Sequence, residues 1–148
     1  MESLQWTVTV DRPQAEVFAY LADIAKHGDW SPKPWRMEGT EEPLTLGTKF
    51  TSYGYIPGDE QHRNDVECTT FEAPNKIELT TQEDNGIFVT AYVLTSEGSG
   101  TKVEKTMDFP SPKGFEGLIF PVLKTAYIKP SVQKGMRNLK HRLESQAS

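Results

Sequence analysis

Three side chains in the predicted strands of this 148-residue sequence are of types that transfer protons or bind polar groups: His62, Tyr92 and Lys105. An imidazole accepts or releases a proton, a phenol donates a hydrogen bond, and an ammonium binds anions. The three residues stand far apart in the sequence, so only the fold can bring them together. They are therefore the candidate catalytic residues, and the chemistry they suggest is proton transfer.

The sequence contains none of the common motifs for metal or cofactor chemistry. It has no His-Glu-x-x-His motif, no Gly-x-Ser-x-Gly motif and no glycine-rich phosphate-binding signature. Its 3 histidines lack the spacing of metal ligands, and its 1 cysteine, Cys68, is expected to be a small buried apolar residue. We therefore expect no metal and no cofactor.

Alternation along the predicted strands turns several polar side chains toward the inner face of the sheet. Arg63 and Asp65 must face water, so period-two alternation turns His62 and Asn64 inward. The same alternation turns Lys105 inward together with apolar neighbours. An inward ammonium has to reach solvent, pair with an anion or lose its charge.

Each of these polar residues also has a purely structural interpretation. His62 follows a predicted turn at Pro57-Gly58 and is compatible with a solvated strand end. Asn64 suits a hydrogen-bond partner within the sheet, and Tyr92 suits an apolar wall. Lys105 is long enough to extend its ammonium to the rim of the sheet. The sequence leaves these alternatives open.

Composition favours one ordinary globular domain, with 36% hydrophobic and 25% charged residues. We expect a single domain over residues 1–148, no membrane span and no signal peptide, which suits the cytoplasm. The net charge is −5, with the excess of acids in residues 1–109 and the excess of bases in residues 110–148. Since no basic stripe is interleaved with aromatic residues, we expect no nucleic-acid partner.

Hydrophobic spacing predicts a strand, a short helix over residues 13–27, further strands and a long C-terminal helix. Apolar residues recur every three or four positions over residues 132–143, with basic residues between them, which is typical of an amphipathic helix. This helix could extend upstream, although Pro121 and Pro130 must kink or break it; the residues that favour the extension are Leu118, Val122, Ala126 and Tyr127. The strands are expected at residues 4–10, 35–40, 47–55, 61–71, 76–82, 87–95 and 101–109.

This order predicts an α+β fold: a curved antiparallel sheet of six to seven strands around a long C-terminal helix. One or two short helices follow the first strand. A helix is only about 10 Å wide, much narrower than such a sheet, so the sheet must curl around it. We expect an internal cavity between them, of the roughly 300–1,000 Å³ usual for small-molecule sites.

The walls of the expected cavity are mostly apolar, with a polar minority that would orient a ligand. Trp30 and Trp35 are expected to pack at its edge. The predicted lining residues are Phe50, His62, Asn64, Val66, Tyr92, Leu94, Lys105, Met107, Phe109, Tyr127 and Met136.

Several local motifs occur in a fixed order along the chain, in the segments Pro13 to Phe18, Asp23 to Pro32, Leu46 to Phe50, Phe71 to Ile77, Gly98 to Val103 and Asn138 to Glu144. These motifs and the order of elements resemble the START-like superfamily, also called SRPBCC or helix-grip, and its polyketide cyclase/dehydrase-type members. The resemblance covers nearly the whole chain and implies the helix-grip fold, but its motifs are structural and name no reaction.

Two functions are compatible with this sequence. The first is binding of a small hydrophobic or aromatic molecule, lipid-like or polyketide-like, in the internal cavity. The second is a cofactor-independent cyclase- or dehydratase-type enzyme that uses acid and base groups in the same cavity. We favour binding because no catalytic pair stands out, and the sequence leaves a homodimer open.

Overall fold

The computed structural model describes residues 2–32, 35–54, 61–83, 86–109 and 124–145. One seven-stranded antiparallel sheet dominates the fold, with strand order β1-β7-β6-β5-β4-β3-β2. The predicted α+β class and the predicted number of strands are confirmed. The strands are β1 (Glu2–Val10), β2 (Arg36–Glu38), β3 (Lys49–Tyr53), β4 (Arg63–Glu72), β5 (Lys76–Glu83), β6 (Gly86–Glu97) and β7 (Gly100–Phe109).

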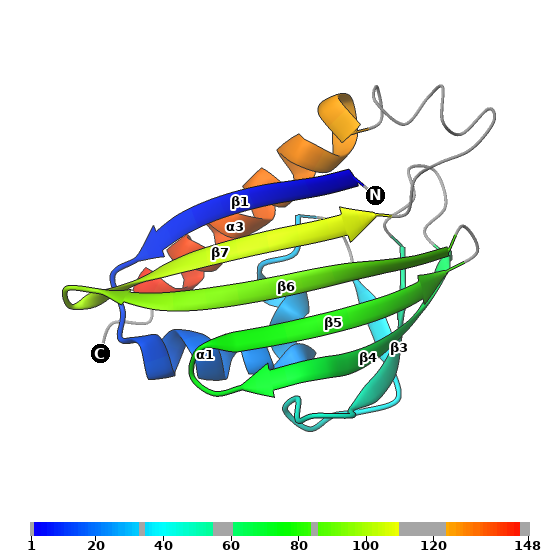
Figure 1. Cartoon of the computed structure of the whole chain (residues 1–148), viewed down its shortest axis with the longest axis horizontal. Coiled ribbons are helices and arrows are strands. Elements are labelled where there is room, and N and C mark those ends of the chain that lie inside the picture. The colour runs from blue at the N-terminus through cyan, green and yellow to red at the C-terminus, as the bar shows by residue number, and fades with distance from the viewer. Residues whose placement is uncertain (1, 33–34, 55–60, 84–85, 110–123, 146–148) are drawn as a thin grey trace.

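The helices lie on one side of the sheet, with the long helix α3 (Lys129–Ser145) crossing behind β1 and β7 (Figure 1). The predicted helix over residues 13–27 is two elements, α1 (Gln14–Ala22) and the 3₁₀ helix η1 (Ile24–Asp29). A π-helical turn, η2 (Lys124–Ile128), precedes α3. The pair α1 and η1 agrees with the predicted one or two short helices after the first strand.

The α-helical part of the C-terminal helix begins at Lys129, so Pro130 is its second residue, where a proline is tolerated. The turn before it, η2, is π-helical, so the helix changes type next to Pro130, in line with the interruption predicted there. Ala126 and Tyr127 lie in η2, so this part of the predicted upstream extension is helical. Leu118, Pro121, Val122 and the turn at residues 57–58 lie outside the described residues.

The apolar stripe of α3 faces the concave side of the sheet, as its spacing predicts. Met136, Leu139 and Leu143 are buried, and Val132, nearer the start of the helix, is half-buried. The sheet bends where β4 has a bulge between Cys68 and Thr70, since a bulge adds a residue to one strand and increases its twist. The curved sheet and the helix therefore share one hydrophobic core.

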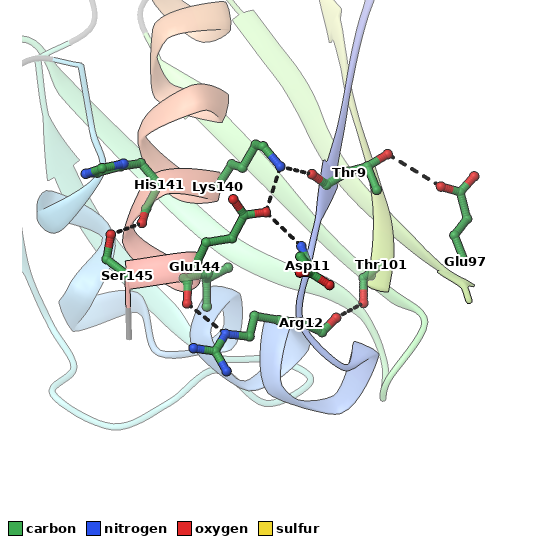
Figure 2. A network of polar contacts seen from close by, with 10 residues as sticks. Thr9, Asp11, Arg12, Glu97, Thr101, Lys140, His141, Glu144 and Ser145 are labelled. Atoms are coloured by element: carbon green, nitrogen blue, oxygen red, sulfur yellow. Dashed lines mark hydrogen bonds and ion pairs between the residues drawn. The ribbon is translucent and has the colours of Figure 1, made fainter. Parts of the chain in front are cut away.

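Polar contacts fasten the C-terminal end of α3 to the end of β1 (Figure 2). Lys140 Nζ donates to the Thr9 carbonyl at 2.7 Å and lies 2.6 Å from Glu144 Oε2. The backbone N–H of Asp11 donates to the same Glu144 oxygen at 2.8 Å. These bonds from Lys140 and Asp11 hold the pKa of Glu144 below its ordinary value. We call Thr9, Asp11, Lys140 and Glu144 the clamp.

Arg12 extends this connection to α1 and β7. Its Nε donates to the Leu143 carbonyl at 3.1 Å, and its own carbonyl accepts from Thr101 Oγ1 at 2.7 Å (Figure 2). The end of α3, the β1–α1 junction and the start of β7 are thus joined at one point.

Candidate functional site

Two of the three candidate catalytic residues are direct neighbours on the inner face of the sheet. Lys105 on β7 pairs with Tyr92 on β6 and with Trp6 on β1. All three side chains are buried: Trp6 and Lys105 are 7% exposed and Tyr92 is 4% exposed. Their inward direction agrees with the alternation in the sequence. We call Trp6, Lys105 and Tyr92 the inner row.

Aromatic rings surround the ammonium of Lys105. Its Nζ lies 5.2 Å from the ring centroid of Tyr92 and 5.9 Å from that of Trp30. Trp30 is itself buried and packs edge-to-face on Tyr92, with centroids 6.5 Å apart. A cation within about 6 Å of an aromatic ring is attracted by the negative face of the ring. This attraction offsets part of the cost of burying the charge.

His27 is a further member of the site that the sequence analysis missed. Its ring packs between Trp30 and Trp35, at centroid distances of 4.3 and 4.6 Å. Burial of the ring and the positive charge of Lys105 lower its pKa to about 3. His27 is therefore a neutral imidazole at neutral pH, although the residue as a whole is only half-buried.

A sequence signal for His27 does exist, in its spacing from Trp30. A 3₁₀ helix has three residues per turn, so residues three apart stand on the same side. His27 and Trp30 have this spacing at the end of η1. The α-helical and strand periods alone do not connect these two residues, because neither period is three.

The C-terminal part of η1 and the following loop are held against α3. Asn138 Nδ2 donates to the Trp30 carbonyl at 3.2 Å. Gly135 on α3 lies so close to Pro32 that an added Cβ would be 3.2 Å from the proline Cδ. Trp6 Nε1 donates to the Lys129 carbonyl at 3.3 Å, so the first half of α3 borders the inner row.

The acid–base properties of the inner row differ from those of a proton-transfer pair. Burial raises the pKa of Tyr92 well above its ordinary value, so its hydroxyl stays protonated and acts as a donor. The neutral His27, with a pKa of about 3, is a weak base. Efficient acid–base catalysis needs groups whose pKa lies near the working pH.

His62 lies far from Tyr92 along the direction of the strands. Asp65 is level with Ile87, because both pair with Gln82. His62 is three residues beyond Asp65 in one direction, and Tyr92 is five residues beyond Ile87 in the other. At about 3.3 Å per residue, roughly 25 Å of strand separates His62 from Tyr92. The three candidate catalytic residues do not meet at one point.

The side chain of His62 contacts a carboxylate that the sequence analysis did not single out. His62 Nε2 lies 2.8 Å from Glu83 Oε2, and the two side chains are only 9% and 10% exposed. Glu83 ends β5, a position expected to be solvated. This pair joins the start of β4 to the end of β5.

Asn64 is buried and points inward, as the alternation predicts. Its Nδ2 lies 3.3 to 3.5 Å from the carbonyl oxygens of Ser52, Gly54 and His62. The side-chain amide is thus engaged with the backbone of β3 and β4, in line with its structural interpretation.

The remaining predicted lining residues are in or beside the hydrophobic core. Phe109 is half-buried and stacks on Phe88, with centroids 5.6 Å apart, and Tyr127 is half-buried on η2. A ligand-sized volume among these residues stays a prediction. The buried members are Phe50, Val66, Tyr92, Leu94, Met107 and Met136.

A hollow of about 460 Å³ lies on the outer face of the sheet, away from the inner row. Its lining includes the charged residues Glu38, Lys49, Asp65 and Glu67, the amide of Gln82 and the exposed Ile87. It also includes Phe50 and Val66, two of the residues predicted to line the internal cavity. No member of the inner row lines this hollow, so it leaves the predicted cavity beside Lys105 and Tyr92 untested.

The described residues hold no group of three or more His, Cys, Asp or Glu side chains placed to bind a metal ion. No helix in this part of the chain is long and apolar enough to cross a membrane.

Comparison with protein families gives one match over almost the whole chain. The family is described as "Polyketide cyclase / dehydrase and lipid transport", and its profile matches residues 1–144. No curated protein matches the chain.

Solved structures share this fold at low sequence identity. Protein TTHA0849 from Thermus thermophilus is 15% identical with a TM-score of 0.78, covering 99% of this chain and 100% of that one. Protein CV1439 from Chromobacterium violaceum is 12% identical with a TM-score of 0.72, covering 97% and 99%. A protein from Arthrobacter aurescens is 17% identical with a TM-score of 0.72, covering 99% and 88%. At these identities the likeness concerns the fold alone.

Proposed function

Because this chain belongs to the polyketide cyclase / dehydrase and lipid transport family, we propose that it binds a small hydrophobic or aromatic molecule. The proposed site lies between the inner face of the sheet and the first half of α3. The family and the fold fit either a hydrophobic-ligand-binding or a cyclase/dehydrase-like protein. The choice between them depends on the chemistry of the inner row.

The observation that carries the proposal is a fixed polar group within apolar surroundings. Lys105 lies inside the sheet among the rings of Tyr92 and Trp30, while neighbouring inward positions such as Val103 and Met107 are apolar. Small-molecule sites typically combine apolar walls with a few placed polar groups that orient the ligand. The apolar walls would supply affinity, and the inner row would set orientation.

The same groups favour binding over proton transfer. A protonated Tyr92 and a neutral His27 donate or accept hydrogen bonds, but neither exchanges protons readily near neutral pH. His62 lies too far away to supply the missing base. Cyclase- or dehydratase-type catalysis remains the alternative, and turnover of a polyketide-like substrate that is lost in Lys105→Met would favour it.

A neutral fluorescent probe tests the binding proposal. N-phenyl-1-naphthylamine should bind the wild-type protein with increased fluorescence. Met107→Trp adds bulk on the inner face and should weaken binding about tenfold, the equivalent of 1.4 kcal/mol. Thr106→Trp adds the same ring on the outer face of β7 and is the matched control.

Circular dichroism should show that both variants are folded. Equal probe affinity in Met107→Trp and wild type would contradict the proposed position of the site. Native mass spectrometry of the purified protein would then look for a co-purifying small molecule.

A single domain over residues 1–148, a cytoplasmic location and a homodimer stay predictions.

A further inference from the structure

The interior beside the inner row is rich in hydrogen-bond donors. Lys105 contributes an ammonium, which carries three donors and no acceptor, and Tyr92 contributes a hydroxyl that stays protonated. Both side chains are almost completely buried. In a protein whose net charge is −5, this region presents a positive charge toward its own interior.

Trp35 provides an independent indication of the same kind. Its Nε1 is buried, and no acceptor among the residues that the structure describes lies within hydrogen-bond distance. Its ring packs on His27, whose other face packs on Trp30. Buried donors nearly always have a partner, so an exception requires an explanation. An acceptor on a bound molecule would supply the missing partner.

His27 lies between these donors without adding a second positive charge. Its imidazole is neutral at neutral pH, so Lys105 is the charged group of the cluster. Trp30 closes one side of the ammonium and is itself fixed by Asn138 on α3. The cluster therefore combines a buried lysine and buried hydrogen-bond donors with bordering aromatic rings.

We infer that the site selects apolar molecules that carry one anionic oxygen group, such as a carboxylate, and that this group binds at Lys105. This inference rests on the proposed function and specifies its ligand class. An anionic oxygen accepts hydrogen bonds from ammonium, hydroxyl and indole donors, and bonds to charged groups are the stronger ones. The apolar part of the molecule contacts the walls of the site.

Two ligands that differ only in the polar group test this inference. Decanoate and decan-1-ol compete with N-phenyl-1-naphthylamine at pH 7.5. On wild-type protein, decanoate should displace the probe at about one tenth of the concentration needed for decan-1-ol, as expected for one charge-assisted hydrogen bond. In Lys105→Met the two ligands should become equally potent.

Two further variants serve as controls for charge and position. Lys105→Arg keeps the charge at the site and should retain the preference for decanoate. Lys102→Met removes a lysine from the opposite face of β7, where it pairs with Glu104, and should also retain it. If Lys105→Met does not fold, Lys105→Gln replaces it.

The outcomes separate this inference from the proposed function. Equal potency of decanoate and decan-1-ol on the wild type, or a preference that persists without the Lys105 charge, overturns the anionic ligand class. In that case probe binding that responds to Met107→Trp still supports a hydrophobic site. If Met107→Trp leaves probe binding unchanged, both the anionic ligand class and the proposed position of the hydrophobic site are overturned.

Discussion

The two halves of α3 contact the sheet in different ways. At the C-terminal half, Leu139 and Leu143 are fully buried, and the clamp fastens the helix to β1. At the first half, Val132 is half-buried, and the helix borders the inner row and the loop that carries Trp30. Met136, near the middle of the helix, is buried as well, so the looser packing concerns the first turns of α3, which border the proposed ligand site.

A pair of truncations on α3 tests this division most directly. Leu139→Ala should lower the free energy of unfolding by about 2–5 kcal/mol, because it removes a fully buried side chain. Val132→Ala, at the half-buried position, should cost about 1 kcal/mol. Urea denaturation measures both, and equal losses would show that the two halves are packed alike.

Acidification should destabilise the end of the molecule that contains His27. The unfolded chain binds a proton at His27 below about pH 6.5, whereas the folded protein does so only near pH 3. The stability from a neutral His27 is thus complete above pH 6.5 and is lost as the pH falls. At pH 5, about 1.5 pH units below 6.5, the unfolding free energy should be lower by about 2 kcal/mol, because each pH unit contributes about 1.36 kcal/mol.

The matched histidine variants isolate this effect from the titration of carboxylates. Between pH 7.5 and pH 5, the unfolding free energy of His27→Gln should fall by about 2 kcal/mol less than that of the wild type. His141→Gln changes an exposed histidine on α3 and should leave the fall unchanged. Identical pH dependence in wild type and His27→Gln would show that the ring is not buried as described.

Removing the clamp should have a smaller effect than removing the core contact beside it. Lys140→Met loses the bonds to Thr9 and Glu144, and because both charged side chains are partly exposed the cost should be about 1 kcal/mol or less. Arg137→Met, at an exposed position of the same helix, is the control. A loss in Lys140→Met as large as that in Leu139→Ala would make the clamp the main support of this end.

The smallest expected change has the opposite sign. Trp35→Phe removes a buried N–H that has no protein acceptor among the described residues, so unfolding free energy should rise by about 0.5–1 kcal/mol. Trp6→Phe removes an N–H that donates to the Lys129 carbonyl and should lower it by a similar amount. Thermal unfolding of both variants, measured without ligand, gives the sign of each change in unfolding free energy. A lower unfolding free energy in both variants would show that the Trp35 N–H already has a hydrogen-bond partner.

The architecture could be predicted from the sequence because it depends on alternation and spacing. The strands appear within a few residues of their predicted bounds, and the resemblance to the SRPBCC superfamily is confirmed by the family match. The inward direction of Tyr92 and Lys105 followed from the period of two. Their contact also required the register of β6 on β7, which alternation alone does not specify.

The parts of the site that were missed, or that were named without a direction, lie outside regular periodicity. His27 is on a 3₁₀ helix, and Trp35 precedes a three-residue strand, so neither belongs to a pattern that indicates direction. Glu83 is at a strand end, where a carboxylate is normally solvated, yet it contacts His62. The contacts of His27 depend on the path of the chain after η1, and the contact of His62 with Glu83 depends on the register of β4 on β5, so no periodic pattern indicates either.

The strand order also has a consequence for how the chain folds. Strands β2 to β6 each pair with the next strand in the sequence, whereas β1 pairs with β7, so that Val8 meets Val103. Contacts between distant segments form more slowly than local ones, because a longer loop must be closed first. The β2–β7 meander should therefore gain hydrogen-exchange protection before β1 during refolding, and simultaneous protection would contradict this order. On the ribosome, β1 has to wait for β7, and the final closure waits for α3, so the first strand synthesised is among the last to be paired.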